Sequence, residues 1–482
     1  MKFRKDHVLP TVRIQKIELE NFKSVHHGEI VFNCGRKVVE QDTEADILGI
    51  YGQNGSGKTS VIEAIAILKS AIEGEAVNPR YAECVAANAE YAKLTFVFDF
   101  QYPVEKSPYT RTVTYSFKME AVPREKSEED QSIEHFRRLS ELYPKKVRIF
   151  DEVISASGLF NGEVQKKQDI LTTFAGKYPI GPVRKIQEYV GEDKDAVEVD
   201  LKAYKIAAER ESKSFIFYEG TMELFEKHSG LSEYFYVLSE MHYYGMFYLY
   251  AVDTRISGIN GSRLVFPFNT RMGLLPLNLM MSSQIPEHIF EELKSNVNSI
   301  NTVLPALVAD MELVLESNDF SSGERSGKEV RLLSKRQDVV IPLRDESAGI
   351  IKLVSILSLV ISAYTDRSVT VAIDELDAGI YEYLLGEILS GLETYGKGQL
   401  VFTSHNLRPL EVLKKESIIF TTSNPDNRYI RLKGVGRTNN LRSLYFREIL
   451  GNSQDEKLYD AAKRQRMIAA FMKAGVDNAK EE

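Results

Sequence analysis

The stretch that most constrains this chain is residues 46–60, DILGIYGQNGSGKTS. It holds a complete phosphate-binding loop, in which four residues separate Gly52 from Gly57 and Lys58-Thr59 follows directly. Backbone N–H groups of such a turn surround phosphate oxygens, because glycine lacks a Cβ, and the next helix points its positive end at the same phosphates. The residues expected to contact a nucleoside triphosphate here are Gly52, Gln53, Asn54, Gly55, Ser56, Gly57, Lys58, Thr59 and Ser60.

The sequence on both sides of the loop fits this interpretation. The apolar run 47–51 is typical of a buried parallel strand, and apolar residues recur on one helical face across 61–72. Lys58 is expected to reach the β- and γ-phosphates, and the Thr59 hydroxyl to coordinate Mg²⁺. ATP and Mg²⁺ are therefore the expected cofactors.

A hydrophobic strand that ends in two carboxylates supplies a second half for such a site. Residues 369–375 are VTVAIDE. Asp374 is expected to hold Mg²⁺, directly or through water, and Glu375 to accept a proton from the attacking water. A DE dipeptide is a weak signal alone, but after a complete phosphate-binding loop it predicts a hydrolytic site.

Five short motifs occur in a characteristic order along the chain: NFKS, GQNGSGKT, ESAGIIKL, AIDELDAGIYEYL and FTSHN. This ordered set resembles the ABC-type ATPases of the SMC, RecF and OLD group, and is most similar to short AAA-labelled bacterial proteins related to the OLD ATPase domain, many of which serve in phage defence. The resemblance covers roughly residues 10–120 and 320–435.

The resemblance implies roles for residues outside the phosphate-binding loop. His405, at the end of the strand after Glu375, would be the switch histidine that senses the γ-phosphate. Ser347 and Gly349 would belong to a degenerate signature motif that closes on the γ-phosphate held by a second subunit; the alternative is that Ser347 is a plain helix N-cap.

Three further residues are assigned from the same resemblance. Lys23 and Ser24, in NFKS, would help to hold the nucleotide. Gln101 follows a strand and would be a metal-contacting Q-loop residue; a surface glutamine at a strand end is the alternative.

The sequence departs from the family pattern in two places. The signature lacks the usual Leu-Ser-Gly-Gly, and Tyr381 stands at the D-loop position that commonly holds Asp or His. Lys352, one turn into the signature helix, is expected to be solvated, with an extra positive charge in trans as the alternative.

The predicted fold is α/β: an ABC-type P-loop ATPase head, with a mixed sheet plus a parallel βαβ core, and a mainly helical insertion. We expect residues 1–121 to form the N-terminal lobe with the Walker A motif, and 122–318 to form the insertion. Residues 319–435 would form the C-terminal lobe with signature, Walker B and switch histidine, and 436–482 a helical tail.

Composition limits the location and the partners. Acidic residues exceed basic ones, 69 to 61, which does not favour attraction of the whole protein to nucleic acid. The N-terminal segment lacks the apolar core of a signal peptide, and the run 349–364 is interrupted by a lysine and three serines. A cytoplasmic protein without a membrane partner is expected.

The leading functional hypothesis is a dimerising ATPase switch that sandwiches ATP between two heads and controls a separate effector, such as a nuclease. We recognise no nuclease motif in the sequence. The alternative is a RecF- or SMC-like maintenance ATPase that binds DNA or RNA, for which the aromatic-rich stretch 234–250 could stack bases; a helical core is the simpler explanation of that stretch. A toxin with a nuclease hidden in 122–318 is a third possibility.

Overall fold

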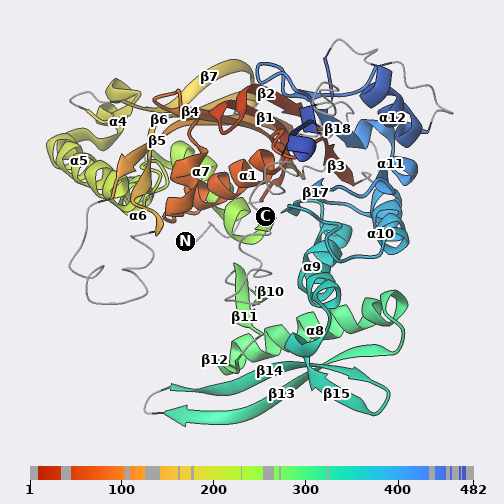
Figure 1. The fold of residues 1–482 in the computed structure, drawn as a ribbon. Helices are drawn as coiled ribbons and strands as arrows, with labels where there is room; N and C mark the ends of the chain where they lie inside the picture. Colours follow the sequence, from red (N-terminus) through yellow and green to blue (C-terminus); the bar gives the residue numbers. More distant parts are fainter. Residues whose placement is uncertain are drawn as a thin grey trace.

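In a computed structural model, the chain folds around two large sheets with helix α1 (Lys58–Ile72) between them. The structure describes residues 9–33, 45–103, 109–124, 142–160, 163–174, 178–228, 231–252, 265–270, 273–279, 281–322, 325–433, 440–451, 456–458, 466–467 and 469–473. Figure 1 shows both sheets in the upper part of the molecule and a smaller lobe below them.

The first sheet is antiparallel throughout and has seven strands in the order β2-β1-β4-β5-β6-β7-β8. In β4, buried and half-buried residues alternate, as expected where one face packs on a core. Its strands are β1 (Thr11–Phe22), β2 (Val25–Val31), β4 (Ala92–Tyr102), β5 (Tyr109–Pro123), β6 (Lys145–Phe160), β7 (Glu163–Thr173) and β8 (Ile180–Gly181).

The second sheet, called the core sheet below, has six strands in the order β19-β18-β3-β17-β16-β9, and every neighbouring pair except β18–β19 is parallel. Its strands are β3 (Asp46–Tyr51), β9 (Leu249–Val252), β16 (Thr370–Ile373), β17 (Gln399–Thr403), β18 (Ile418–Thr421) and β19 (Tyr429–Ile430). Because β3, β17 and β16 are parallel, their carboxyl ends meet at one edge, which we call the carboxyl edge.

Helices cover both faces of the core sheet. Side chains of α1 share one apolar core with the antiparallel sheet and with one face of the core sheet, and α9 and α10 contribute to a second core on the other face. The remaining helices are α4 (Val183–Val190), α5 (Lys194–Glu211), α6 (Glu219–Lys227), α7 (Ser232–Phe247), α8 (Glu287–Leu307), α9 (Ala348–Thr365), α10 (Glu382–Tyr395), α11 (Pro409–Val412) and α12 (Leu441–Gly451). Short 3₁₀ turns are η1 (Pro79–Cys84), η2 (Gly191–Asp193), η4 (Leu343–Asp345) and η5 (Lys415–Ser417).

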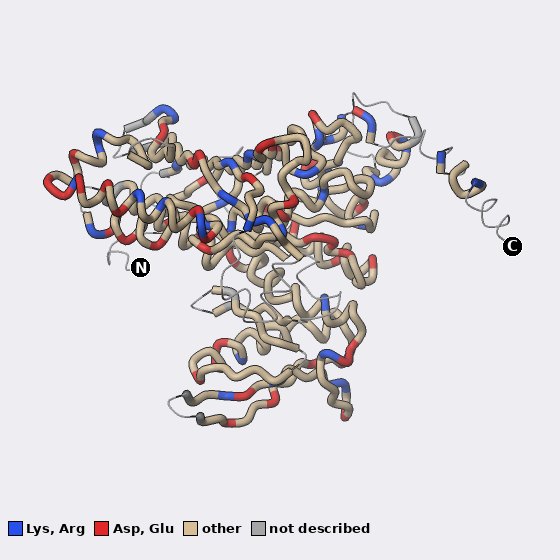
Figure 2. Tube along the Cα trace, turned by 60° about the vertical axis from the view of Figure 1, so that its left-hand side comes forward, with Lys and Arg blue, Asp and Glu red and all other residues tan. Residues whose placement is uncertain are grey.

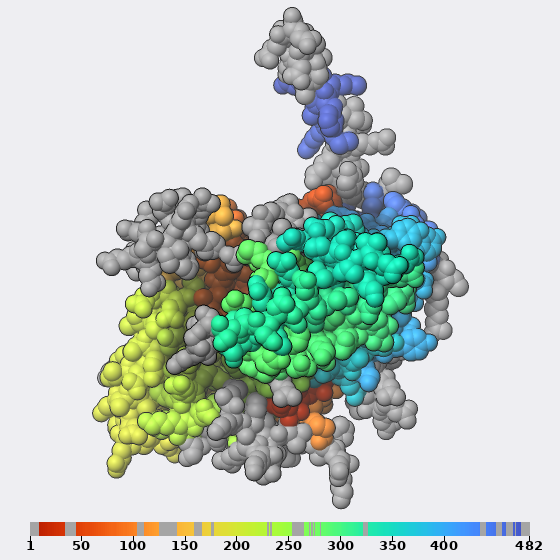
Figure 3. Space-filling model, turned by 90° about the horizontal axis from the view of Figure 1, so that it is seen from below, coloured from red at the N-terminus to blue at the C-terminus, as the bar shows by residue number. Residues whose placement is uncertain are grey.

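The lower lobe has its own core, built by α8, α9 and two small sheets. A long hairpin pairs β13 with β14, whose other edge carries β12 and β15, and β10 pairs with β11. Seen from below, this lobe covers the centre of the molecule (Figure 3). Its strands are β10 (Val265–Thr270), β11 (Gly273–Asn278), β12 (Ser283–Ile285), β13 (Met311–Ser322), β14 (Arg325–Arg336) and β15 (Val339–Pro342).

The predicted α/β class, with a mixed sheet arrangement and a parallel βαβ core, is confirmed. The stretch 122–318 contains α4 to α8, but it also contributes β6 to β8 to the antiparallel sheet and β9 to the core sheet. The boundaries expected near 121 and 318 lie within β5 and β13. Strands β6 to β8 pair with neighbours close in sequence, whereas β9 pairs with β16, more than 100 residues further along the chain.

Within the described part of the chain, one helix, α9, is long and apolar enough to cross a membrane, and 56% of it is buried inside the protein. Its side chains belong to the core under the core sheet and to the core of the lower lobe. Packing of α9 between two cores accounts for its high apolar content.

Candidate functional site

The phosphate-binding loop turns sharply between β3 and α1. All six residues of β3 are buried, and α1 begins directly after Gly57, which has a φ of 91°. Gly52 has a φ of 154°, and a Cβ at this position would lie 1.8 Å from the Thr421 hydroxyl. Glycine is therefore required at Gly52 by close packing and at Gly57 by backbone conformation.

Lys58 lies inside this turn. Its ammonium donates to the carbonyl oxygens of Gly52 (2.8 Å) and Gln53 (3.0 Å), and the residue is 7% exposed. Burial lowers the pKa of Lys58, while the carboxylates of Asp374, Glu375 and Asp377 oppose that shift. A buried ammonium at the centre of a glycine-rich turn is suited to binding phosphate oxygens.

The β18–β19 hairpin supports the loop from behind. The Thr421 and Ser56 hydroxyls are bonded to each other (2.5 Å), and the Tyr429 hydroxyl donates to the Gly57 carbonyl (2.7 Å). The buried Arg428 donates to the carbonyl oxygens of Thr422 (2.7 Å) and Ser24. No sequence motif indicates that this hairpin, about 370 residues after the loop, would hold it.

Asp374 and Thr59 meet at the carboxyl edge. The Thr59 hydroxyl lies 3.1 and 3.2 Å from the two carboxylate oxygens of Asp374, which is 3% exposed. The Thr403 hydroxyl donates to Asp374 (2.6 Å) and accepts the Glu375 N–H (2.8 Å). The sequence-predicted metal residues Thr59 and Asp374 are thus brought together, and Thr403, which the sequence did not single out, orients Asp374 and Glu375.

His405 follows β17 and is exposed at the same edge. Its backbone N–H and that of Asn406 donate to the Asp377 carboxylate (3.2 and 3.0 Å). Asp377 comes two residues after Glu375. The Asp377 carboxylate therefore links, by these hydrogen bonds, the loop that carries Glu375 to the loop that carries His405.

Lys23 and Ser24 lie beside the phosphate-binding loop at the turn between β1 and β2. The Lys23 ammonium pairs with the buried Glu63 of α1, and the Ser24 hydroxyl donates to the Gly55 carbonyl (3.3 Å). The Lys23 N–H donates to the Cys84 carbonyl (2.7 Å). The turn of NFKS is therefore in contact with both the phosphate-binding loop and α1.

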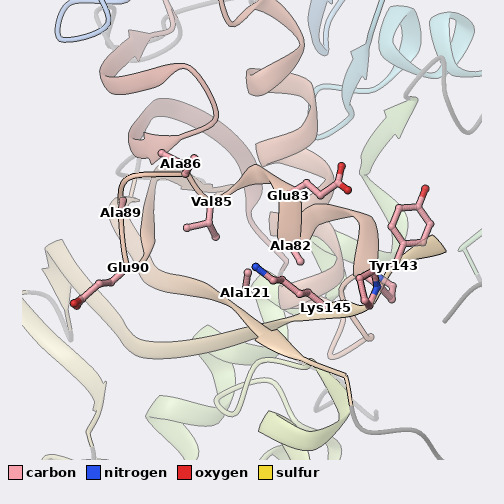
Figure 4. A pocket seen from close by; sticks show the side chains of 12 residues that line it. Ala82, Glu83, Val85, Ala86, Ala89, Glu90, Ala121, Tyr143 and Lys145 are labelled. Carbon is pink, nitrogen blue, oxygen red and sulfur yellow. The ribbon is translucent and has the colours of Figure 1, made fainter. Parts of the chain in front are cut away.

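The loop that contains Cys84 also forms one wall of a pocket of about 390 Å³ (Figure 4). Small side chains line much of it, and Tyr143 and Lys145 lie on the opposite wall. The lining residues are Pro79, Ala82, Glu83, Val85, Ala86, Ala87, Ala89, Glu90, Ala121, Tyr143, Pro144 and Lys145.

Gln101 is not brought to the carboxyl edge. It pairs with Thr11 in the antiparallel sheet, and its amide donates to Asp99 (2.6 Å). Asp99 lies opposite Arg13 in the pairing of β4 with β1. The Arg13 guanidinium donates to the carbonyl of Arg367 (3.2 Å), which lies just before β16 begins. Gln101 thus lies toward the amino ends of the core strands, away from Asp374. The strand that lies beside Asp374 is β9, not the strand that carries Gln101. This placement does not support a metal role.

Ser347 and Gly349 lie at the start of α9 and, among the described residues, make no hydrogen bond to the phosphate-binding loop. Ser347 is exposed, and its hydroxyl caps the helix by accepting the Ile350 N–H (3.4 Å). A Cβ on Gly349 would lie 2.1 Å from the Gly379 carbonyl, so the start of α9 packs directly on the segment after Glu375.

Two other predictions concern residues near Ser347. Tyr381 is exposed, as a residue at a contact surface would be, and its ring lies 5.8 Å from that of Tyr383. Lys352 was expected to be solvated, but the structure shows it 8% exposed with its ammonium bonded to the Glu375 carbonyl. That expectation was wrong because α9 is covered on both sides.

One family model matches part of the chain. Residues 16–213 match the family model described as AAA domain, a segment that includes Lys23 and the complete phosphate-binding loop. No curated protein matches the chain in sequence.

Solved structures found to be similar include the SMC head bound to the C-terminal winged-helix domain of ScpA (14% identity, TM-score 0.39, covering 87% of this chain and 98% of that one). Two others are the recombination mediator RecF (11%, 0.35, 88% and 99%) and the SMC head domain from Thermotoga maritima (12%, 0.33, 87% and 99%).

Proposed function

We propose that this chain binds and hydrolyses ATP as an ABC/SMC-like ATPase that works as a dimerising switch. The observation that carries the proposal is the meeting of Lys58, Thr59 and Asp374 at one edge of a parallel sheet, next to Glu375 and His405. Ligand sites of open α/β sheets form at this edge.

The residues present fit Mg²⁺ bound together with a nucleotide. Among the described residues, no three or more His, Cys, Asp or Glu side chains form a preformed metal site. Thr59 and Asp374 supply only two oxygen-bearing groups, a set suited to an ion that keeps waters and takes further ligands from phosphates. Mg²⁺ would be held by Thr59 and Asp374, and it would neutralise charge that develops on the γ-phosphate.

The chain's own groups have distinct roles in this proposal. Lys58 and the loop N–H groups bind the β- and γ-phosphates, and Lys23 and Ser24 flank the nucleotide. Glu375 accepts a proton from water as the water oxygen bonds to the γ-phosphorus and the bond to the bridging oxygen breaks. His405 contacts the γ-phosphate. Because the bond between the γ-phosphorus and the bridging oxygen breaks, ADP and phosphate are the products.

The location of Ser347 supports a second copy as part of the site. It caps an exposed helix start that lies against the Gly379 segment rather than on the phosphate-binding loop. Ser347 and Gly349 of one copy would close on the γ-phosphate held by another copy.

Control of a separate effector in bacterial phage defence is the biological setting that we infer. It depends on the resemblance to OLD-related ATPases and on the absence of a recognisable nuclease motif in the sequence. RecF- or SMC-like nucleic-acid maintenance is the competing setting. Acidic residues outnumber basic ones, 69 to 61, which does not favour the competing setting. Figure 2 marks where residues of both charges lie along the trace.

Two substitutions test the ATPase itself. Lys58→Ala should weaken ATP binding, and Glu375→Gln should keep ATP binding but lower phosphate release by about 100-fold or more. Lys69→Ala is a matched control, because Lys69 lies on the same helix and pairs with Glu73. Unchanged phosphate release in both site variants would refute the proposal.

The setting needs its own experiment. Cells that express the native gene cluster should restrict phage growth, and Lys58→Ala in this chain should abolish that restriction. If instead the purified protein binds DNA with a steep salt dependence and the cluster does not restrict phage, the maintenance setting is favoured.

A further inference from the structure

Lys352 is a buried cation that the ATPase mechanism above does not use. It lies on the second turn of α9, is 8% exposed, and its neighbours Ile351 and Leu353 belong to two different apolar cores. Burial of a lysine is costly unless its ammonium is paired, so its partners need an explanation.

The ammonium of Lys352 donates to the main-chain carbonyl oxygen of Glu375. Glu375 has a φ of 47°, in the left-handed region that a residue with a side chain rarely adopts. Its N–H is held by the Thr403 hydroxyl at 2.8 Å. Side chains from α9 and β17 therefore hold both polar groups of the Glu375 backbone, and its carbonyl oxygen also accepts the Ala378 N–H (3.0 Å).

The surroundings of Lys352 are otherwise acidic. The negative charges of the Asp374, Glu375 and Asp377 carboxylates stabilise the charged form of its ammonium. The same three carboxylates stabilise the ammonium of Lys58. Lys58 and Lys352 thus lie on α1 and α9, the helices that cover opposite faces of the core sheet, with the carboxylates at its edge between them.

We propose that Lys352 is a positioning residue for ATP hydrolysis, which holds the left-handed backbone of Glu375 so that its carboxylate faces the water that attacks the γ-phosphate. This inference depends on the proposed ATPase function and adds a residue to it. The hydrogen bond that Lys352 donates goes to the main-chain carbonyl oxygen of Glu375 and not to its carboxylate, so Lys352 acts through Glu375.

The same bond connects the signature segment to the hydrolytic residue of one chain. Ser347 caps α9, and Lys352 is five residues further, about 7.5 Å along a helix axis. Gly349 packs on Gly379 in the segment that follows Glu375. A shift of the start of α9, when Ser347 meets a phosphate of another copy, is therefore transmitted to Glu375 through a side chain and a backbone contact.

Three variants separate positioning from the other roles that a buried lysine can have. Lys352→Met keeps the length and burial of the side chain but removes the donor, and Lys352→Arg keeps a charged donor. Ser355→Ala is the matched control, because Ser355 lies on the same helix and bonds to the Ile351 carbonyl rather than to Glu375. ATP affinity, thermal melting and single-turnover hydrolysis of radiolabelled ATP are measured for each variant.

We expect Lys352→Met to lower the hydrolysis rate about 100-fold while ATP affinity stays within about twofold, with partial recovery in Lys352→Arg and no loss in Ser355→Ala. In the Glu375→Gln background, Lys352→Met should cause no further loss, because both changes remove the same function.

Several outcomes would overturn the inference. They are a loss of ATP affinity equal to the loss of rate, an additive loss in the Glu375→Gln background, or normal hydrolysis by Lys352→Met. If Lys352→Met fails to fold, the comparison rests on Lys352→Arg: a partly lowered hydrolysis rate with unchanged ATP affinity would support the inference, and a normal rate or a loss of ATP affinity would count against it. A wild-type protein without turnover would instead refute the ATPase proposal.

Discussion

At the scale of single residues, Glu152 on β6 shows how this protein tolerates a buried charge away from the site. It is 1% exposed, and it accepts hydrogen bonds from the Tyr115 hydroxyl (2.6 Å) and the Phe215 N–H (2.8 Å). The Ser214 hydroxyl and the Ile216 N–H complete its partners. One carboxylate thus fixes the 214–216 segment between α5 and α6 to the antiparallel sheet.

We predict that Glu152→Ala lowers the free energy of unfolding by roughly 2–4 kcal/mol, because it leaves several buried donors without an acceptor. Glu152→Gln should cost less, because its amide oxygen can serve the N–H groups and the hydroxyls can reorient. Urea unfolding at neutral pH measures both values. Equal stability of the alanine variant and the wild type would contradict the prediction.

The same residue predicts a pH dependence. Burial raises the pKa of Glu152 above its ordinary value of 4.5. The folded state therefore binds this proton more tightly than the unfolded chain, and its contribution to stability falls as the pH rises above about 4.5. Glu152→Gln should remove this part of the pH slope, which urea unfolding from pH 4 to pH 7 would reveal. Parallel curves for the two proteins would show that Glu152 does not titrate in this range.

Individual site residues were predictable where a local motif specifies them. The loop from Gly52 to Thr59 and the pair Asp374-Glu375 lie where the sequence placed them relative to strands and helices. Thr403 was not singled out and Lys352 was expected to be solvated, because their contacts with Asp374 and Glu375 depend on the tertiary fold. Gln101 was misassigned because many strands end in a polar residue.

At the scale of elements, the β18–β19 hairpin is the main support of the phosphate-binding loop. Tyr429 is 6% exposed, and its hydroxyl donates to the carbonyl of Gly57, the N-cap residue of α1. Removal of one such bond in a buried position costs about 1 kcal/mol. The loop geometry should therefore depend on a hydroxyl from the far end of the chain.

We predict that Tyr429→Phe weakens ATP binding by roughly fivefold, which corresponds to the loss of that bond. Titration with a fluorescent ATP analogue measures the change. Tyr445→Phe is the control, because the ring of Tyr445 stacks on Phe420 of β18 (4.9 Å) and the substitution keeps that stacking. A weakening of the same size in both variants would point to general loosening of the hairpin rather than to the bond to Gly57.

The parallel core was the most predictable part of the fold. The strand expected at 399–403 is β17, and the strand expected at 369–373 is β16 within one residue. Strand β9 was missed because its four residues directly follow α7 and form a strand only by pairing with β16. From the sequence, residues 286–317 suggest one or two helices with a break at Pro305, but α8 continues through Pro305 to Leu307 and Met311 already begins β13.

At the scale of the whole molecule, the carboxyl edge and the start of α9 form one connected unit within a single chain. Asp377 joins the loops of Glu375 and His405, and Gly349 packs on Gly379. Exposed aromatic side chains, Tyr381 and Tyr383, lie beside this unit, and Arg408 stacks on the second of them (4.8 Å). Tyrosine and arginine are frequent in the centres of protein interfaces, which is consistent with a second copy docking here.

The arrangement predicts that the protein associates with a second copy when ATP is bound and remains monomeric without ATP. In Glu375→Gln, which should bind ATP without turning it over, gel filtration is expected to show dimers with ATP and monomers without it. Adding Ser347→Glu should prevent dimer formation, because a carboxylate at the start of α9 would repel the γ-phosphate of the other copy. The fold should not suffer, since an acidic residue is favourable at a helix N-terminus.

Ser347→Asn is the matched variant, because asparagine caps a helix as well as serine does and adds no charge. It should dimerise with ATP, and both variants should bind ATP as single chains with unchanged affinity, since Ser347, among the described residues, makes no hydrogen bond to the phosphate-binding loop. If Ser347→Glu dimerises as readily as Ser347→Asn, then α9 does not face the nucleotide of a second copy. Ser347 would then be a helix cap alone, and Lys352 would position Glu375 without any signal from a partner.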